Sequence, residues 1–328
     1  MAGTAQREPV AARFGALGSG GGYESFYLRA VDPARPRGVW LRHTIHQAPG
    51  HGPVGSIWVT LLDADAPAPV THKLTLPSPQ AVEGGGVRIG ESVFGADAVR
   101  GGAGPAASWD LRWDGDEPPL RHLPKAIMYS APLPRTKLES PHPAARFAGR
   151  VTVGDTTLEL DGWPGMVGHN WGAQHAERWI WLHGVAFDGM PDAWLDLSLG
   201  RVRLGPFTTP WIANGAVSVG GHRVRLGGTT ARAHVHEHPL ALDLRLTRGH
   251  ARVRLTVHSR RPQTAVWRYA DPDGSEHHVA NCSVAELEAV VHPEGGTPLT
   301  LRTAHGGTYE LGMREHTHGL PVQPFPDP

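Results

Sequence analysis

The strongest constraint on this chain is an alternation of apolar and polar residues that recurs along most of its length. Clear examples are 39–45, 56–62, 70–76 and 108–113, and such runs are bounded by Gly, Pro or Asp. A period of two places alternate side chains on opposite faces of an extended strand, whereas a helix repeats every 3.6 residues. The pattern therefore predicts a protein built almost entirely from β-strands.

Short loops that carry glycine predict antiparallel hairpins between neighbouring strands. Strand-like runs flank such loops at 154–155, 220–221, 248–250, 271–274 and 305–307. The segment 283–290 fits a helix and a strand equally imperfectly, and its hairpin surroundings favour a strand. About fourteen to sixteen strands follow, which is too many for one small barrel. We expect two consecutive antiparallel β-barrels with little helix, formed by residues 1–186 and 187–328.

A proline-rich stretch at 118–143 is predicted to be a long connection, with a short strand at 125–129. The chain has 42 glycines and 30 prolines among its 328 residues. We attribute this high content to turns between the strands of hairpins rather than to disorder.

Composition excludes several classes of protein. The 31 Lys and Arg residues balance the 31 Asp and Glu residues without a basic block, which argues against nucleic-acid binding. The lone cysteine, Cys282, excludes a disulfide framework and a Cys-based metal centre, and we expect it to be buried and inert. No apolar run reaches the roughly 18 residues of a membrane span, and residues 1–14 lack the apolar core of a signal peptide. We therefore expect a cytoplasmic protein.

The densest chemistry lies in Gly-His-Asn-Trp-Gly at 168–172 and Arg-Trp-Ile-Trp-Leu-His at 178–183. His169, Asn170 and Trp171 offer a proton carrier, an amide and an aromatic face, and the bracketing glycines permit close backbone approach. Taken alone, these residues fit a functional site and a tight interstrand turn with satisfied polar groups, and both interpretations stay open.

The first of these motifs resembles the His-Asn-Trp-Gly core of carotenoid 1,2-hydratases (hydroxyneurosporene synthases) and, more loosely, the Asn-Trp-Gly of tocopherol cyclases. Both belong with the AttH-like double-lipocalin proteins. Residues 24–28 with 39–42, 179–181 and 309–315 are also similar to stretches of this superfamily. The resemblance implies two lipocalin-like barrels, an apolar pocket between or within them, and cofactor-free acid chemistry on isoprenoid double bonds.

The resemblance also implies roles for individual residues. His169 and Trp171 would line the site, and an aromatic-x-Asp pair that supplies the catalytic acid would fall on Trp194 and Asp196. Trp194 stands where the hydratases carry Tyr, which leaves open whether substrate and reaction are retained. The remaining substrate-binding candidates are Asn170, Trp179, Trp181 and, on family grounds only, Glu24.

The chemistry of such a site is coherent. An Asp in an apolar pocket would keep its proton through desolvation, tryptophan faces would stabilise a carbocation, and His169 would restore the proton. Capture of water gives hydration, capture of an internal hydroxyl gives cyclisation, and loss of a proton gives isomerisation. Asp196 shares a strand face with Trp194, although a turn or surface position for Asp196 is the alternative.

Three histidines, His234, His236 and His238, alternate along one strand face, which is compatible with zinc binding but favours a solvated face. His277 with His278 and His316 with His318 are further candidates. We expect no metal and no cofactor.

Three hypotheses of function result. The favoured one is a cofactor-independent lyase or isomerase that acts on a terpenoid or similar lipophilic polyene. Its rivals are a non-catalytic carrier of a hydrophobic small molecule and, more weakly, a His-ligated metal protein. A transient contact with a membrane surface and the oligomeric state are left open.

Overall fold

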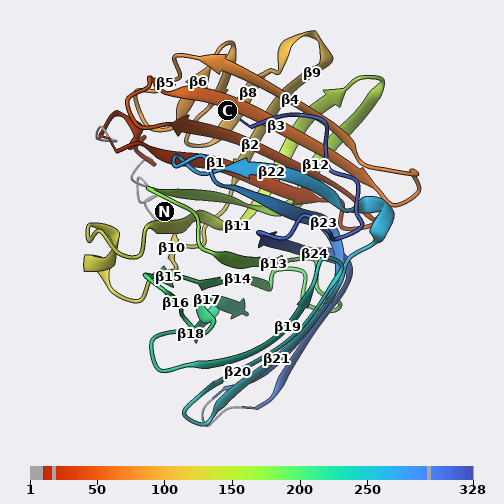
Figure 1. The fold of residues 1–328 in the computed structure, drawn as a ribbon. Coiled ribbons are helices and arrows are strands. Elements are labelled where there is room, and N and C mark those ends of the chain that lie inside the picture. Colours follow the sequence, from red (N-terminus) through yellow and green to blue (C-terminus); the bar gives the residue numbers. More distant parts are fainter. Residues whose placement is uncertain (1–9, 17–19, 294–296, 328) are drawn as a thin grey trace.

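The computed structural model describes residues 10–16, 20–293 and 297–327, and most of them lie in two curled antiparallel sheets (Figure 1). Each sheet curls on itself and the two follow one another along the chain, so the prediction of an all-β fold with two consecutive antiparallel barrels and little helix is confirmed. The described helical segments are single 3-10 turns: η1 (Phe14–Ala16), η2 (Gly104–Ala106), η3 (Ala126–Tyr129) and η4 (Arg261–Gln263).

The N-terminal sheet runs in the order β4-β3-β2-β1-β12-β11-β9-β8-β7-β6-β5, with β10 paired to β11. Its strands are β1 (Gly22–Val31), β2 (Arg37–Gln47), β3 (Val54–Asp63), β4 (Val70–Pro77), β5 (Gln80–Ala81), β6 (Val87–Ile89), β7 (Ser92–Phe94), β8 (Ala98–Gly102), β9 (Ala107–Asp114), β10 (Leu120–Arg121), β11 (Thr136–Val153) and β12 (Thr156–Gly172). The sheet curls until β6 meets β3, where a Cβ at Gly55 would lie 2.8 Å from Ile89. Glycine is therefore required at this closure.

The C-terminal sheet runs in the order β18-β17-β14-β13-β24-β23-β21-β20-β19, with β22 paired to β23. Its strands are β13 (Arg178–Gly184), β14 (Trp194–Arg201), β17 (Ile212–Val219), β18 (His222–Gly227), β19 (Arg232–His238), β20 (Ala241–Arg248), β21 (Ala251–His258), β22 (Ala265–Ala270), β23 (Glu276–His292) and β24 (Leu299–Met313). The short strands β15 (Arg203–Leu204) and β16 (Phe207–Thr208) form a separate hairpin.

Strands β1 and β2 are buried almost throughout because each is covered on both faces. One face of β1 carries Phe26 and Leu28 into the N-terminal barrel, and the other packs against the C-terminal sheet. Arg29 joins the two sheets by donating to the backbone oxygens of Ser283 (2.9 Å) and Gly306 (3.1 Å). The space between the sheets is thus built by the outer faces of β1 and β2.

Some local predictions were wrong. Residues 125–129 form the 3-10 turn η3 instead of a strand. The expected hairpin around 305–307 is one continuous strand, β24. The reason is that Gly306 and Gly307 serve close backbone packing, since a Cβ at these positions would lie 2.0 Å from the oxygen of Val185 and 2.7 Å from that of Ala285. The strand count is higher than expected because pieces of two or three residues, such as β5 and β7, are too short to show an alternation.

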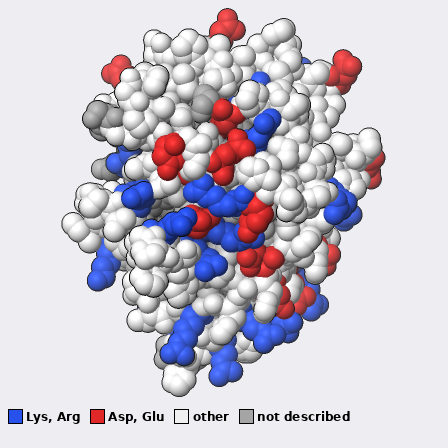
Figure 2. All heavy atoms as spheres, viewed as in Figure 1, with Lys and Arg blue, Asp and Glu red and all other residues white. Residues whose placement is uncertain are grey.

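Other local predictions are confirmed. Residues 283–290 lie in strand β23, and Cys282 is buried and free. The histidines His234, His236 and His238 are exposed along β19, as a solvated strand face requires. Lys and Arg side chains meet Asp and Glu side chains across the middle of the face shown in Figure 2, in keeping with a net charge of zero.

Candidate functional site

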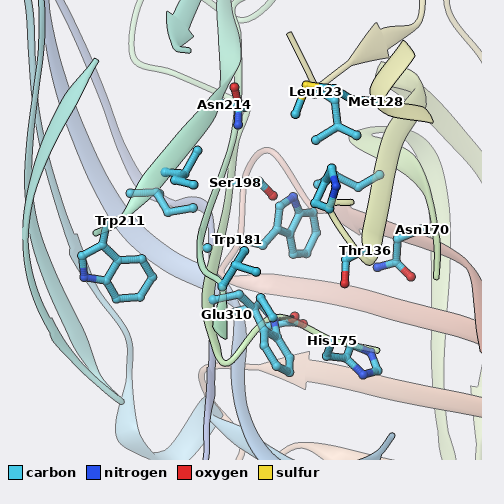
Figure 3. Close-up of a pocket in the computed structure, with 18 of the residues that line it drawn as sticks. Leu123, Met128, Thr136, Asn170, His175, Trp181, Ser198, Trp211, Asn214 and Glu310 are labelled. Carbon is cyan, nitrogen blue, oxygen red and sulfur yellow. Dashed lines mark hydrogen bonds between the residues drawn. The ribbon is translucent and has the colours of Figure 1, made fainter. Parts of the chain in front are cut away.

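A cavity of about 360 Å³ lies between the two sheets (Figure 3). This volume is within the range of small-molecule sites. The N-terminal sheet contributes Tyr23, Tyr27, Trp40, Arg42, Thr136 and Asn170, and the C-terminal sheet contributes Trp179, Trp181, Ser198, Asn214, Tyr269 and Glu310. Leu123 and Met128 from the connection before β11, and Trp211 just before β17, complete the wall. The lining is mainly apolar and aromatic.

Two tryptophans of β13 are held in the cavity wall by buried carboxylates. The indole N–H of Trp179 donates to Glu310 Oε1 at 2.9 Å, and that of Trp181 donates to Asp196 Oδ1 at 3.1 Å. Glu310 also accepts from the amide of Asn281 at 3.1 Å. These bonds fix the rings, so that their faces rather than their polar edges meet a ligand.

Several polar atoms in the wall lack a partner among the residues that the structure describes. Asn170 Oδ1, Asn214 Oδ1 and His175 Nε2 are buried without a hydrogen bond, and all three residues line the cavity. An unsatisfied buried polar atom costs about 1–3 kcal/mol, so a ligand or water that satisfies these atoms is favoured. The cavity therefore offers polar anchors within an aromatic shell.

His175 is the most chemically capable of these residues. Its Nδ1 lies 2.7 Å from Asp271 Oδ1, and its backbone N–H donates to the same oxygen at 2.8 Å. The ring stacks on Tyr23, with centroids 3.9 Å apart, and on Trp179, at 5.2 Å. Nδ1 is thereby occupied by the carboxylate, while Nε2 is left for the cavity.

Asp271 is an ionised anchor for this imidazole. Burial raises the pKa of its carboxyl, but the side-chain and backbone hydrogen bonds from His175 outweigh burial, and the pKa falls to about 2. A carboxylate accepts hydrogen bonds, so Nδ1 of His175 carries the proton. Nε2 can then accept a proton from a ligand and return it, which is the behaviour of a general base and acid.

Asn170 of β12 faces the cavity, whereas the predicted residue His169 lies on the opposite face of the strand, which faces the interior of the N-terminal barrel. Its Nε2 is 2.7 Å from Glu24 Oε1, and its Nδ1 is 3.3 Å from Glu139 Oε1. The ring stacks between Phe26 (4.6 Å) and Trp171 (4.7 Å). Both nitrogens of His169 are therefore occupied, and neither His169 nor Trp171 lines the cavity.

Asp196 stands behind Trp181 and is fully buried. Besides Trp181 it accepts from the hydroxyl of Ser140 at 2.5 Å, and His122 Nε2 lies 3.4 Å from its Oδ2. Burial raises the pKa of Asp196, as the sequence argument assumed. The charge and hydrogen bond of His122 lower this pKa, and with the contributions of His183 and Ser140 the lowering outweighs burial, so the pKa of Asp196 lies below its usual value. The carboxylate is ionised, which does not suit it to hold a proton for an alkene.

The structure brings together only part of the predicted site. Asn170, Trp179 and Trp181 line the cavity, whereas Glu24 and Trp194 are fully buried outside its lining. Glu24 accepts from the backbone N–H groups of Arg13 and Phe14 at 2.8 Å each, and Trp194 lies under the Arg223 guanidinium at 4.9 Å. Neither His169 nor Asp196 lines the cavity. Their respective partners, Glu139 and Ser140, are consecutive residues of β11.

Sequence reasoning missed His175, Asp271 and Tyr23. His175 follows the Asn-Trp-Gly motif by only three residues, and Asp271 lies in a loop that reads simply as a hairpin turn. A usable signal was present for Tyr27, Arg42 and Glu310, because each lies in a stretch that resembles the AttH-like proteins and each lines the cavity.

Comparisons with known proteins place the fold but leave the family open. No family model matches the chain. Two Mycobacterium tuberculosis proteins, the uncharacterized protein MT0513 of strain CDC 1551 and the uncharacterized protein Rv0493c of strain H37Rv, are each 32% identical over 179 residues. The match covers 52% of this chain and 52% of each relative, so the chain spans about half the length of these curated relatives.

Solved structures share the architecture at low sequence identity. The crystal structure of CghA with Sch210972 has a TM-score of 0.63 and 11% identity, and the match covers 90% of this chain and 88% of CghA. The crystal structure of CghA alone has a TM-score of 0.61 and 12% identity, and the match covers 90% of each chain. An AttH-like protein of Nitrosomonas europaea has a TM-score of 0.53 and 13% identity, and the match covers 89% of this chain and 92% of that protein. These likenesses show the AttH-like, lipocalin-like fold. Within the described residues, no helix has the length and apolar character needed to cross a bilayer.

Proposed function

We propose that this chain is an enzyme that rearranges a lipophilic small molecule in the cavity between its sheets, with His175 as the proton-transfer group. The observation that carries the proposal is the unpartnered Nε2 of His175, buried in an aromatic wall while Nδ1 is held by Asp271. CghA, which shares the fold, was crystallised with the small molecule Sch210972, and this supports a small-molecule role for such a cavity.

The cavity favours a terpenoid-like or polyene skeleton that carries an oxygen function. Trp40, Trp179, Trp181 and Trp211 provide apolar faces for the skeleton. Arg42 provides positive charge, with its guanidinium 4.1 Å from the Tyr269 ring centroid. Burial raises the pKa of Tyr269 far above its usual value, so its hydroxyl keeps its proton. A carbonyl oxygen would therefore lie toward Arg42 and Tyr269.

The chemistry that suits this site is proton transfer beside a carbonyl group. An imidazole is too weak an acid to protonate an isolated alkene, but it can remove a proton from a carbon next to a carbonyl. The C–H electron pair then forms a carbon–carbon double bond, and the carbonyl electrons move to oxygen, where Arg42 and Tyr269 stabilise the charge. Return of the proton from Nε2 to another carbon of the enolate gives an isomer. Attack by the enolate carbon on a conjugated double bond of the same molecule gives a ring: the first carbonyl re-forms, the double bond breaks, and its electrons end on a carbon that takes the proton from Nε2.

A panel of terpenoid ketones, each paired with the hydrocarbon that lacks the carbonyl, tests the proposal in D2O. We expect the wild-type chain to convert a ketone to a product that carries deuterium, with a new retention time. His175→Asn should lower the rate about 10²–10⁴-fold, because a positioned general base contributes this much. His234→Asn, at an exposed position of β19, is the matched control and should not change the rate.

The outcomes separate the candidate functions. A product heavier by one water would instead show hydration, and a bound ketone recovered without exchange would show a carrier, which the mainly apolar lining also favours. Conversion of the hydrocarbons would overturn the role of the carbonyl. A His175→Asn rate within twofold of wild type would remove His175 from the reaction.

A further inference from the structure

Four side chains that play no part in the proposed reaction meet where β23 begins. Glu276 and His278 are two residues apart on β23, and His316 and His318 are two residues apart in the segment after β24. Residues two apart in a strand face the same side, so Glu276 and His278 point the same way from β23, and the rings of His316 and His318 both contact the ring of His278. We propose that Glu276, His278 and His316 form a zinc-binding site, with His318 as a positioning residue.

The donor atoms are already close. One potential ligand atom from each of Glu276, His278 and His316 lies within 4.8 Å of the others. His278 Nε2 is 3.5 Å from Glu276 Oε1, and the ring of His316 stacks on that of His278 with centroids 4.1 Å apart, so His316 has to rotate out of the stack to share an ion with His278. Zinc–ligand bonds of about 2.0–2.2 Å in a tetrahedron require donor atoms about 3.3 Å apart. His316 is exposed, so it can turn by the remaining distance without disturbing the core.

The second nitrogen of the central histidine has a neighbour that can orient it. His278 Nδ1 lies 2.9 Å from His318 Nε2. With zinc on Nε2, His278 would donate its Nδ1–H to His318 Nε2, and His318 Nδ1 would then give up the bond that it accepts from the backbone N–H of Leu320 at 3.3 Å.

The ligand set matches zinc better than a hard cation. Two imidazoles and one carboxylate are typical zinc donors, whereas Ca²⁺ and Mg²⁺ prefer oxygen ligands. Of the residues that the structure describes, these three make the one group of three histidine, cysteine or acidic donors close enough to share an ion. The more conspicuous series His234, His236 and His238 is spread along an exposed strand and has no such convergence.

Zinc here would fasten the end of the chain to the sheet. The segment that carries His316 and His318 continues back across the N-terminal sheet, as Figure 1 shows. There Phe325 stacks on Trp267 at 5.9 Å, and Asp327 pairs with the buried Lys73 at 2.6 Å. An ion that bridges β23 and His316 would bind the folded state selectively and stabilise it by mass action.

Titration of the untagged, chelator-treated full chain with ZnCl2 tests the site. We expect one Zn²⁺ per chain by calorimetry, a higher melting temperature with zinc, and the intense visible absorption of tetrahedral cobalt when Co²⁺ is used instead. His316→Ala and Glu276→Gln should each weaken zinc binding at least tenfold. His238→Ala is the matched control, because His238 is an exposed histidine of a different cluster, and it should bind zinc like wild type.

The opposite results would overturn the site. These are no stoichiometric zinc in the wild type, unchanged affinity in His316→Ala, or loss of zinc in His238→Ala. His318→Gln separates a positioning role from a ligand role: weaker binding with the tetrahedral cobalt spectrum retained supports positioning, and loss of that spectrum makes His318 a ligand and overturns its positioning role.

Discussion

Two histidines six residues apart, His169 in the N-terminal barrel and His175 in the cavity, have similar surroundings but opposite capacities. Each ring is stacked between aromatic rings, and each has one nitrogen 2.7 Å from a carboxylate oxygen, of Glu24 for His169 and of Asp271 for His175. His169 has carboxylates on both nitrogens, Glu24 and Glu139, whereas His175 has one on Nδ1 and leaves Nε2 without a partner among the described residues. The first arrangement suits a structural role in the barrel, and the second leaves a nitrogen that can accept a proton from a ligand.

The difference teaches that a histidine in a conspicuous motif is not thereby the reactive one. A nitrogen that is already hydrogen-bonded to a carboxylate must lose that bond before it can accept a proton from a ligand. The availability of one nitrogen, and what faces it, decides function. Replacing the partners of each histidine separates these two roles.

The largest effect is expected when the barrel loses Glu24. Glu24→Ala leaves His169 Nε2 and the backbone N–H groups of Arg13 and Phe14 without their acceptor. Breaking a buried pair by removing one partner costs about 3–5 kcal/mol, and we expect this loss in the free energy of unfolding measured in urea. Glu159→Ala removes an exposed partner of Arg150 and should cost less than about 1 kcal/mol. Equal losses in the two variants would contradict a structural role for Glu24.

The next effect is expected at Asp271. Asp271→Asn removes the charge that fixes the tautomer of His175, so we expect the rate on a substrate found with the ketone panel to fall about 10²-fold. Asp273→Asn, two residues along the same loop, changes an exposed carboxylate that accepts from Ser275 and Gln174 and should leave the rate unchanged. If both variants behave alike, the dyad is not the proton-transfer unit.

A third histidine sharpens the comparison through pH. His43 lies inside the N-terminal barrel, where the Ser92 hydroxyl, at 2.8 Å, is the one hydrogen-bond partner of its ring among the described residues, and burial lowers its pKa to about 3. The unfolded chain binds a proton at His43 below its usual pKa of about 6.5, whereas the folded chain does not until about pH 3. Stability is therefore present above pH 6.5 and lost as pH falls, by about 2 kcal/mol at pH 5 from this residue.

Removing the titrating group checks this sign. His43→Gln can keep a bond to Ser92 without a proton to bind, so the difference in unfolding free energy between pH 8 and pH 5 should shrink by about 2 kcal/mol. The exposed His51, replaced in the same way, should leave that difference unchanged. A His43→Gln chain with the full acid sensitivity of wild type would show that the loss arises elsewhere.

How far the sequence leads depends on the range of the interaction. The alternation predicted the all-β fold and most hairpins because strand faces are local properties. It misread 305–307, where glycines allow contact with the distant residues Val185 and Ala285 instead of a turn. The motifs at 168–172 and 178–183, with the family resemblance, pointed to Asn170, Trp179 and Trp181, which line the cavity. His175, however, meets Asp271 across 96 residues, and no local pattern records that contact. Asp196 shows the same limit, because its protonation depends on Ser140 of β11 and on His122, which follows β10.

The smallest effect is expected at Asp196, the residue that the family resemblance points to as the catalytic acid. In the structure its carboxylate acts through Trp181, whose indole N–H it accepts at 3.1 Å. Asp196→Asn keeps an oxygen for this bond, so Trp181 should stay in place, and we expect the rate to fall less than tenfold, or about 1.4 kcal/mol. Full loss of the rate, equal to that of His175→Asn, would instead make Asp196 the acid. Trp181→Phe distinguishes the two routes: if Asp196 acts only through this ring, adding Asp196→Asn to Trp181→Phe should lower the rate no further, because the two changes remove the same interaction.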